Sequence, residues 1–196
     1  MDEEKKDIVS FQDIMPLCEI FVKSGIFEDT KDVAQAIVKV LAGREIGLSP
    51  LQSMMNLYIV KNRVVPNAQI ISALIKKSKT YDYKILKLDN EECSIEFFKR
   101  DEKNAENSLG ISSFTVKDAA RAGVINGTNW KGYPRNMLYA RAITNGARWF
   151  CPDSTMGAGT SIEELESVAN NNTVISTVSM TPEGEVTNGK ENKKSV

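Results

Sequence analysis

The chain has 196 residues, with 25 basic side chains, 26 acidic side chains and no histidine. The lack of histidine excludes Ser–His–Asp and Cys–His catalysis and every histidine-ligated metal site. The net charge of −1 hides a basic middle, because the net charge is −5 over residues 1–30, +8 over 31–150 and −4 over 151–196. We therefore expect an acidic N-terminal helical segment (1–29), a basic core (30–156) and a mostly disordered, acidic tail (157–196) in which polar residues dominate.

The spacing of apolar residues, together with capping and turn residues, predicts the elements along the chain. In chain order they are a helix over 11–23 capped by Ser10; a helix capped by Thr30 that ends between 43 and 47; a short helix over 50–56 after Ser49; a hairpin of 58–60 and 64–65; a helix over 68–77; strands over 81–88, 93–98 and 111–114; a short helix opened by the capping box Thr115-x-x-Asp118; a loop over 126–129; a long helix over 134–150; and a short helix over 162–168. The sequence therefore predicts an α+β fold with a small antiparallel sheet and a hairpin packed by helices.

The three cysteines, Cys18, Cys93 and Cys151, lie far apart and form no CxxC pair. This predicts neither a zinc site nor a redox pair, and we expect buried structural thiols in a reducing cytosol. The charged start MDEEKK leads into an amphipathic stretch, so no signal peptide is expected. No run of about 18 apolar residues occurs, so no membrane partner is expected either.

Acidic residues gather around the predicted turn between the strands over 81–88 and 93–98. Asp89, Glu92 and Glu96 are of the type that holds Mg²⁺ in a metal-dependent nuclease. The alternative interpretation is a solvated sheet edge. No phosphate-binding pattern of the form GxxxxGK[ST] or GxGxxG occurs, which argues against nucleotide hydrolysis.

Residues 117–150 carry six basic side chains against one acidic side chain, and aromatic residues lie among them. On the predicted helix from Pro134, the side chains of Arg141, Asn145 and Arg148 share one face, which we expect to project into solvent beside a buried stripe of small residues. The aromatic residues before this helix, Trp130 and Tyr133, would either stack on bases or cover the core. The pattern indicates nucleic-acid binding, with a merely solvated basic face as the alternative.

Further basic side chains of the same region add to its positive charge. Lys61 and Arg63 lie at the tip of the predicted hairpin, and Lys76 and Lys77 end the helix over 68–77. The candidate DNA-binding residues are Lys61, Arg63, Lys76, Lys77, Arg121, Trp130, Lys131, Tyr133, Arg135, Arg141, Asn145 and Arg148. A non-catalytic structural or adaptor protein, whose basic face contacts an acidic partner, remains an alternative.

Four sequence blocks resemble a known family in content and in order. They are Gly43-Arg-Glu-Ile-Gly-Leu-Ser-Pro50, Tyr58-Ile-Val-Lys-Asn-Arg63, Phe114-Thr-Val-Lys-Asp-Ala-Ala-Arg-Ala-Gly123 and Trp130-x-x-Tyr-Pro-Arg-x-Met-Leu-x-x-Arg-Ala142, with Arg148 after the last. Over about residues 30–156 the chain is similar to the phage single-strand annealing proteins of the RecT and Red beta family. The last block is the specific one, and the others count only as a series.

The resemblance implies a Rad52-like annealing core and ATP-independent annealing of single-stranded DNA in homologous recombination. It implies a ring or helical filament with DNA in a basic groove, in the cytoplasm of a prokaryotic host that carries the phage or prophage. Arg135, Arg141 and Arg148 would face the DNA, Trp130 matches the family's tryptophan, and the hairpin with Lys61 and Arg63 resembles one that lines the groove.

The resemblance also bears on cofactors and partners. The implied partners are single-stranded DNA, the annealed duplex intermediate and further copies of the chain. The family also recruits a phage exonuclease or a single-strand binding protein, but no matching C-terminal domain is recognisable after about residue 157. No covalent catalysis and no cofactor are expected, and any Mg²⁺ would be bound through the DNA. Asn136 departs from the family, in which a second basic residue is frequent.

Overall fold

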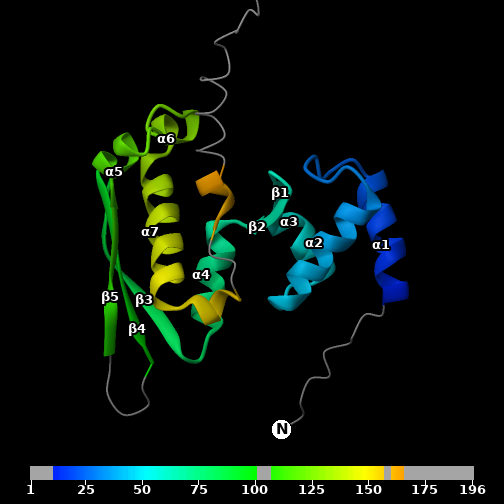
Figure 1. Ribbon diagram of the computed structural model, residues 1–196, viewed down its shortest axis with the longest axis horizontal. Coiled ribbons are helices and arrows are strands. Elements are labelled where there is room, and N and C mark those ends of the chain that lie inside the picture. The colour runs from blue at the N-terminus through cyan, green and yellow to red at the C-terminus, as the bar shows by residue number, and fades with distance from the viewer. Residues whose placement is uncertain (1–10, 101–106, 157–159, 166–196) are drawn as a thin grey trace, which may run out of the picture.

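Apolar side chains gather in two groups, one before residue 57 and one after residue 67, in the computed structural model of the chain. The structure describes residues 11–100, 107–156 and 160–165. Figure 1 shows the two groups as neighbouring lobes, with the strand β2 leading from one to the other. Helices combine with two antiparallel sheets, which confirms the α+β class expected from the sequence.

The helices and strands follow the predicted order closely. They are α1 (Phe11–Lys23), α2 (Val33–Glu45), α3 (Pro50–Asn56), β1 (Leu57–Val60), β2 (Arg63–Pro66), α4 (Ala68–Lys77), β3 (Tyr81–Leu88), β4 (Glu92–Lys99), β5 (Asn107–Thr115), α5 (Val116–Arg121), α6 (Thr128–Gly132), α7 (Pro134–Phe150) and the 3₁₀ turn η1 (Pro152–Thr155). Residues 162–165 form a further helical turn. The remainder of the predicted helix to 168 and the tail beyond 165 lie outside the described residues.

The N-terminal lobe packs α1, α2 and α3 around one small core. Ile14 and Cys18 of α1 meet Ala36 and Val40 of α2 and Met54 of α3. The predicted boundary between residues 29 and 30 therefore falls inside a group of packed side chains.

The N-cap of α2 differs from the prediction. Asp32 caps the helix, and its Oδ1 accepts a hydrogen bond from the amide of Gln35 at 2.8 Å. The predicted cap, Thr30, is buried, and its hydroxyl lies within hydrogen-bond distance of Asp29 and Lys39 instead. Ser49 caps α3 as predicted, in a capping box with Gln52.

The hairpin of β1 and β2 closes through a two-residue turn. Lys61 and Asn62 both have positive φ, at 50° and 60°, as a type I′ turn requires. Arg63 belongs to β2 and pairs with Val60, so the tip is one residue shorter than the predicted Lys61-Asn62-Arg63.

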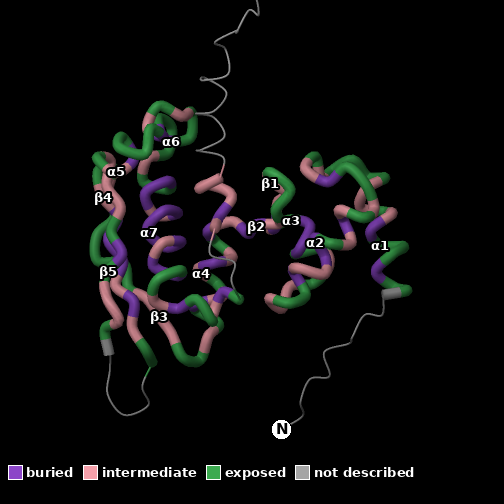
Figure 2. The backbone as a smooth tube through the Cα atoms, viewed as in Figure 1, coloured by how far each residue is buried: buried purple, intermediate pink, exposed green. Residues whose placement is uncertain are grey.

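The C-terminal lobe is a three-stranded antiparallel sheet of order β3-β4-β5 covered on one face by α7. Alternate residues of β4, Cys93, Ile95 and Phe97, are buried in its core. Figure 2 shows α7 as a largely buried helix, with α4 beside it. The hydroxyl of Ser112 in β5 donates to the carbonyl of Ala142 at 2.8 Å and ties the sheet to the helix.

The segment between the sheet and α7 contains one more helix than predicted. The capping box of Thr115 and Asp118 opens α5 as expected. The stretch predicted as a loop over 126–129 instead runs into the short helix α6 from Thr128, because Trp130 is drawn into the core. None of the helices in the described part of the chain combines the length and hydropathy needed to cross a membrane.

Candidate nucleic-acid interface

The junction of α6 and α7 exposes two basic side chains and, between them in the sequence, an aromatic ring. Lys131 and Arg135 are exposed, and Tyr133 is 66% exposed. The carbonyl of Tyr133 accepts hydrogen bonds from the amides of Asn136 and Met137, and Pro134 takes the first helical position, so α7 begins here. Local backbone structure thus fixes where all three side chains start. Of the two roles left open for Tyr133, its exposure favours an open surface over covering the core.

Trp130 does not belong to this exposed group. Its indole is 4% exposed and lies against the ring of Phe114, with ring centroids 6.1 Å apart. Of the two predicted roles, covering the core is correct and stacking on bases is wrong for this conformation. The physical reason is that α6 turns the large apolar ring inward, where its burial stabilises the lobe by about 2–3 kcal/mol.

Arg121 lies at the end of α5 and is paired. Its Nη1 lies 3.1 Å from Oδ1 of Asp118, but the guanidinium side chain is 81% exposed. Hydrogen bonds from the hydroxyl and then the amide of Thr115, followed by the charge of Arg121, hold the pKa of Asp118 below its usual value although partial desolvation opposes this. Because the pair is so exposed, it contributes little to stability and leaves Arg121 available to another anion.

The face of α7 that carries Arg141, Asn145 and Arg148 is only partly open to solvent. The prediction that Arg141 projects into water is wrong, because its side chain is only 9% exposed. Asn145 is half-buried, and the Arg148 side chain is 42% exposed. Periodicity correctly grouped these residues on one face, but residues 160–165 cover it.

Glu164 joins the two arginines of this face. Its Oε1 lies 3.2 Å from Nη1 of Arg141, and its Oε2 lies 2.9 Å from Nη2 of Arg148. Arg141 also lies over the ring of Phe114, with Cζ 5.8 Å from the centroid. Burial lowers the pKa of Arg141, the charge of Glu164 raises it and the charge of Arg148 lowers it, with a net lowering.

Lys61 and Arg63 are exposed on the hairpin. A buried ion pair of the N-terminal lobe holds the first strand of the hairpin in place. Nζ of Lys39 lies 2.8 Å from Oδ2 of Asp29, and the same oxygen accepts a hydrogen bond from the amide of Ile59 in β1 at 2.8 Å. Lys39 is fully buried and lies near the rings of Phe27 and Tyr58. The sequence did not indicate a role for Lys39, because its position on the predicted helix does not show that a carboxylate contacts it.

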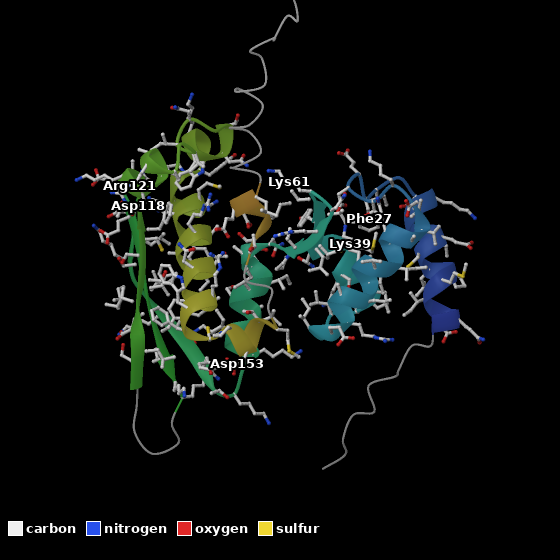
Figure 3. All side chains as sticks on the ribbon, viewed as in Figure 1. Phe27, Lys39, Lys61, Asp118, Arg121 and Asp153 are labelled. Atoms are coloured by element: carbon white, nitrogen blue, oxygen red, sulfur yellow. The ribbon has the colours of Figure 1, made fainter. Side chains whose placement is uncertain are left out.

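The candidate residues are not all brought together. Figure 3 shows Lys61 between the two lobes and Arg121 at the far edge of the C-terminal lobe. Lys76 and Lys77 end α4, which contacts η1 after the last turn of α7. The 17 residues of α7 separate that end from Arg135 by about 25 Å.

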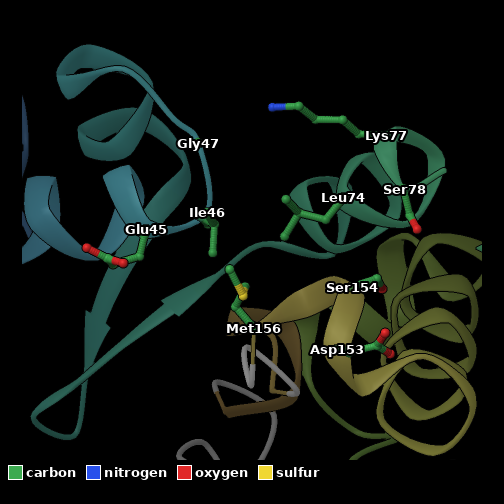
Figure 4. Close-up of a pocket in the computed structure, with 9 residues that line it drawn as sticks. All are labelled: Glu45, Ile46, Gly47, Leu74, Lys77, Ser78, Asp153, Ser154 and Met156. Carbon is green, nitrogen blue, oxygen red and sulfur yellow. The ribbon is translucent and has the colours of Figure 1, made fainter. Parts of the chain in front are cut away.

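Lys76 and Lys77 also differ from one another. Lys76 is engaged by Asp82 and by the ring of Tyr83, with Nζ 4.4 Å from the centroid. Lys77 is exposed beside a cavity of about 280 Å³, which Glu45 and Asp153 also line (Figure 4). Acidic side chains lie beside both lysines. The net positive charge that the two lysines present to a polyanion is therefore smaller than their number indicates.

The acidic residues proposed for a nuclease do not form a metal site. Lys87 lies 3.5 Å from Asp89 and 2.9 Å from Glu92, so its single positive charge is shared between the two carboxylates. Glu92 and Glu96 share one face of β4, but four residues of strand separate them by about 13 Å. Across the residues that the structure describes, no three His, Cys, Asp or Glu side chains gather so as to hold a metal ion.

The three cysteines are free and fully buried, as predicted. Burial, and after it the charge of Glu92, raises the pKa of Cys93 to about 11, and burial also raises the pKa of Cys18 and of Cys151. Thiols of this kind are poor nucleophiles and poor metal ligands at neutral pH.

Comparison with known proteins adds no further evidence. No model of a known protein family matches the chain, and no curated protein is similar to it in sequence.

Proposed function

We propose that the chain binds single-stranded DNA and anneals it to a complementary strand without ATP, in homologous recombination. The observation that carries the proposal is the exposed trio at the α6–α7 junction, Lys131, Tyr133 and Arg135, which alternate along the sequence. Cationic side chains neutralise phosphates and release counterions, and an exposed ring offers a surface on which a base stacks. These are the two elements of sequence-independent binding to a single strand.

The position of the trio supports this proposal further. The N-terminal end of α7 has no side-chain cap, and the helix dipole adds partial positive charge beside Arg135. Arg121, which is 81% exposed at the end of α5, offers a further positive charge on the same lobe. A strand held by its phosphates keeps its bases free, so the incoming strand and not the protein would read the sequence.

The chemistry of the chain agrees with a stoichiometric binding role. Annealing needs no general base, no bound nucleotide and no metal of the protein's own, which suits a chain without histidine or a phosphate-binding loop. The resemblance to RecT and Red beta proteins makes a Rad52-like annealing core, an oligomeric ring or filament and a cytoplasmic site of action in a prokaryotic host part of the proposal. A phage exonuclease or a single-strand binding protein is the proposed partner class.

The test mixes two complementary labelled oligonucleotides with the protein at low salt, without ATP, and follows pairing by fluorescence transfer. We expect faster pairing than in buffer alone and a steep loss of the effect as salt rises. The variant Lys131→Gln with Arg135→Gln should lose most of the acceleration. The matched control, Lys31→Gln with Lys84→Gln, removes two exposed charges elsewhere and should keep it.

The outcome separates the proposal from its rivals. If the wild-type protein does not accelerate pairing at low salt, the annealing function is wrong. If labelled single-stranded DNA also keeps its mobility when the protein is added, the adaptor interpretation, in which the basic face contacts an acidic protein, takes its place.

A further inference from the structure

We infer that residues 160–165 compete internally with DNA for the basic face of α7, and that Glu164 holds the place of a phosphate between Arg141 and Arg148. This inference rests on the proposed function and adds a regulatory element to it. The segment is brought onto α7 from beyond η1, and one carboxylate engages both guanidinium groups, at 3.2 and 2.9 Å. Guanidinium groups bind carboxylate and phosphate oxygens with the same planar hydrogen-bonding geometry, so the two anions are direct competitors.

The segment is attached at two points by its two adjacent acidic residues. Both carboxylate oxygens of Glu163 lie 3.2 Å from the amide of Ala68, the first residue of α4. Arg141 additionally reaches the carbonyl of Glu164, with Nη2 3.5 Å from that oxygen. The segment is thus fixed to α4 by a hydrogen bond and to α7 by two ion pairs, of which the half-exposed contact with Arg148 is the one that salt weakens most.

Two features indicate that this docked position is reversible. The Ser161 side chain is fully buried, and its hydroxyl has no hydrogen-bond partner among the described residues. On release it would regain water, which recovers a desolvation penalty of about 1–3 kcal/mol. The contact with Arg148 is half open to solvent, since the arginine side chain is 42% exposed, and this gives an incoming phosphate a point of entry.

The consequence is a second basic surface that becomes available only when the segment leaves. DNA first held at the α6–α7 junction would exchange Glu164 for its own phosphates at Arg148 and then at Arg141. The exchange replaces one anion by another, so Arg141 is never left buried without an anion beside it.

The test compares Glu164→Gln with the matched control Glu163→Gln in the full chain. Both variants lose one negative charge. The amide oxygen introduced at position 163 can still accept the bond from Ala68, whereas a neutral amide at position 164 brings no negative charge to the two arginines. We expect Glu164→Gln to bind a fluorescent oligothymidine about fivefold or more tightly than wild type at low salt, and Glu163→Gln to change the affinity less than about twofold.

Hydrogen exchange of the wild-type protein provides a second test that needs no variant. The amides of Glu164 and Leu165 donate to the carbonyl of Ser161, so their hydrogen exchange reports the docked turn. We expect exchange at 160–165 to accelerate when the oligonucleotide is added, and this result decides the matter if Glu164→Gln does not fold.

Equal affinities of the two variants, or exchange at 160–165 that stays constant or slows in the complex, would overturn the inference while the annealing function stands. If wild type and both variants all fail to bind the oligonucleotide, the proposed function falls and the inference falls with it.

Discussion

The ring of Phe97 in β4 lies directly against the backbone of Gly146 in α7, in the space that a side chain at position 146 would occupy. The same ring packs at a tilt against Tyr83 and Phe150, with centroids 6.1 and 5.6 Å away. This close approach sets how deeply α7 lies on the sheet, and so it fixes the lobe that carries the α6–α7 junction.

We expect Gly146→Ala to lower the free energy of unfolding by about 1–3 kcal/mol, because the added methyl group overlaps the Phe97 ring. Intrinsic helix propensity alone would favour alanine by about 1 kcal/mol. Gly132→Ala in α6 is the matched control, since no atom lies within 4 Å of the position of its Cβ. Urea denaturation of both variants measures the difference, and an equal effect at the two sites would contradict the close contact.

The two ends of α7 show how far the sequence predicts this fold. Pro134 and the apolar spacing up to Phe150 are local signals, and they predicted the helix with its correct bounds. The choice between Thr30 and Asp32 as the cap of α2 was not predictable in the same way, because Lys39, nine residues further on, engages Thr30.

The candidate site likewise has features that local sequence determines and features that depend on residues distant in the sequence. Tyr133 and Arg135 flank the first helical residue, which Pro134 predicted; the sequence left open whether Tyr133 is exposed or covers the core. The cover over Arg141 and Arg148 depends on Glu164, which lies 23 and 16 residues away in sequence. Periodicity states which residues share a helical face, but not which segment packs on it; only the opposite charge of Glu163 and Glu164 hinted at the pairing.

The buried pair of Asp29 and Lys39 predicts an asymmetric response to losing either partner. Asp29→Asn leaves a fully buried ammonium group without its counter-ion, and we expect a loss of about 3–5 kcal/mol. Lys39→Met leaves a carboxylate that is 24% exposed and still accepts from the amide of Ile59, so the loss should be smaller.

Thermal or urea denaturation of the two single variants and the double variant tests this asymmetry. The double variant should be more stable than the sum of the single losses indicates, because neither charge is then left alone. Additive losses, or a greater loss for Lys39→Met, would show that the two groups are not coupled as the structure has them.

The buried thiols predict a stability that falls at alkaline pH. The pKa of Cys93 is about 11 in the folded chain, and burial likewise raises the pKa of Cys18 and of Cys151. The unfolded thiols ionise at lower pH, near about 8.5, so the unfolded state binds fewer protons above that value. The contribution of Cys93 is therefore fully present below about pH 8.5 and is lost as the pH rises towards 11, by roughly 3 kcal/mol in all.

Urea denaturation at about pH 8 and about pH 10 measures this loss. Cys93→Ala should show a smaller decline between the two pH values than wild type, whatever its stability at the lower one. A decline of the same size in both proteins would mean that Cys93 does not carry the effect.

Arg135 and Arg141 lie six residues apart on α7, yet the structure predicts a DNA-binding role for the first and a structural role for the second. Arg135 is exposed, so Arg135→Gln should leave the free energy of unfolding within about 0.5 kcal/mol of wild type. Its affinity for single-stranded DNA should fall, and the dependence of affinity on salt should become shallower by about one phosphate contact. Arg141 is 8% exposed and engages Glu164, so Arg141→Gln should instead destabilise the docked position of residues 160–165, by about 1–3 kcal/mol, because it leaves the Glu164 carboxylate with Arg148 alone. Denaturation and salt-dependent binding measured on both variants separate the two roles, and a destabilised Arg135→Gln beside a fully stable Arg141→Gln would reverse the assignment.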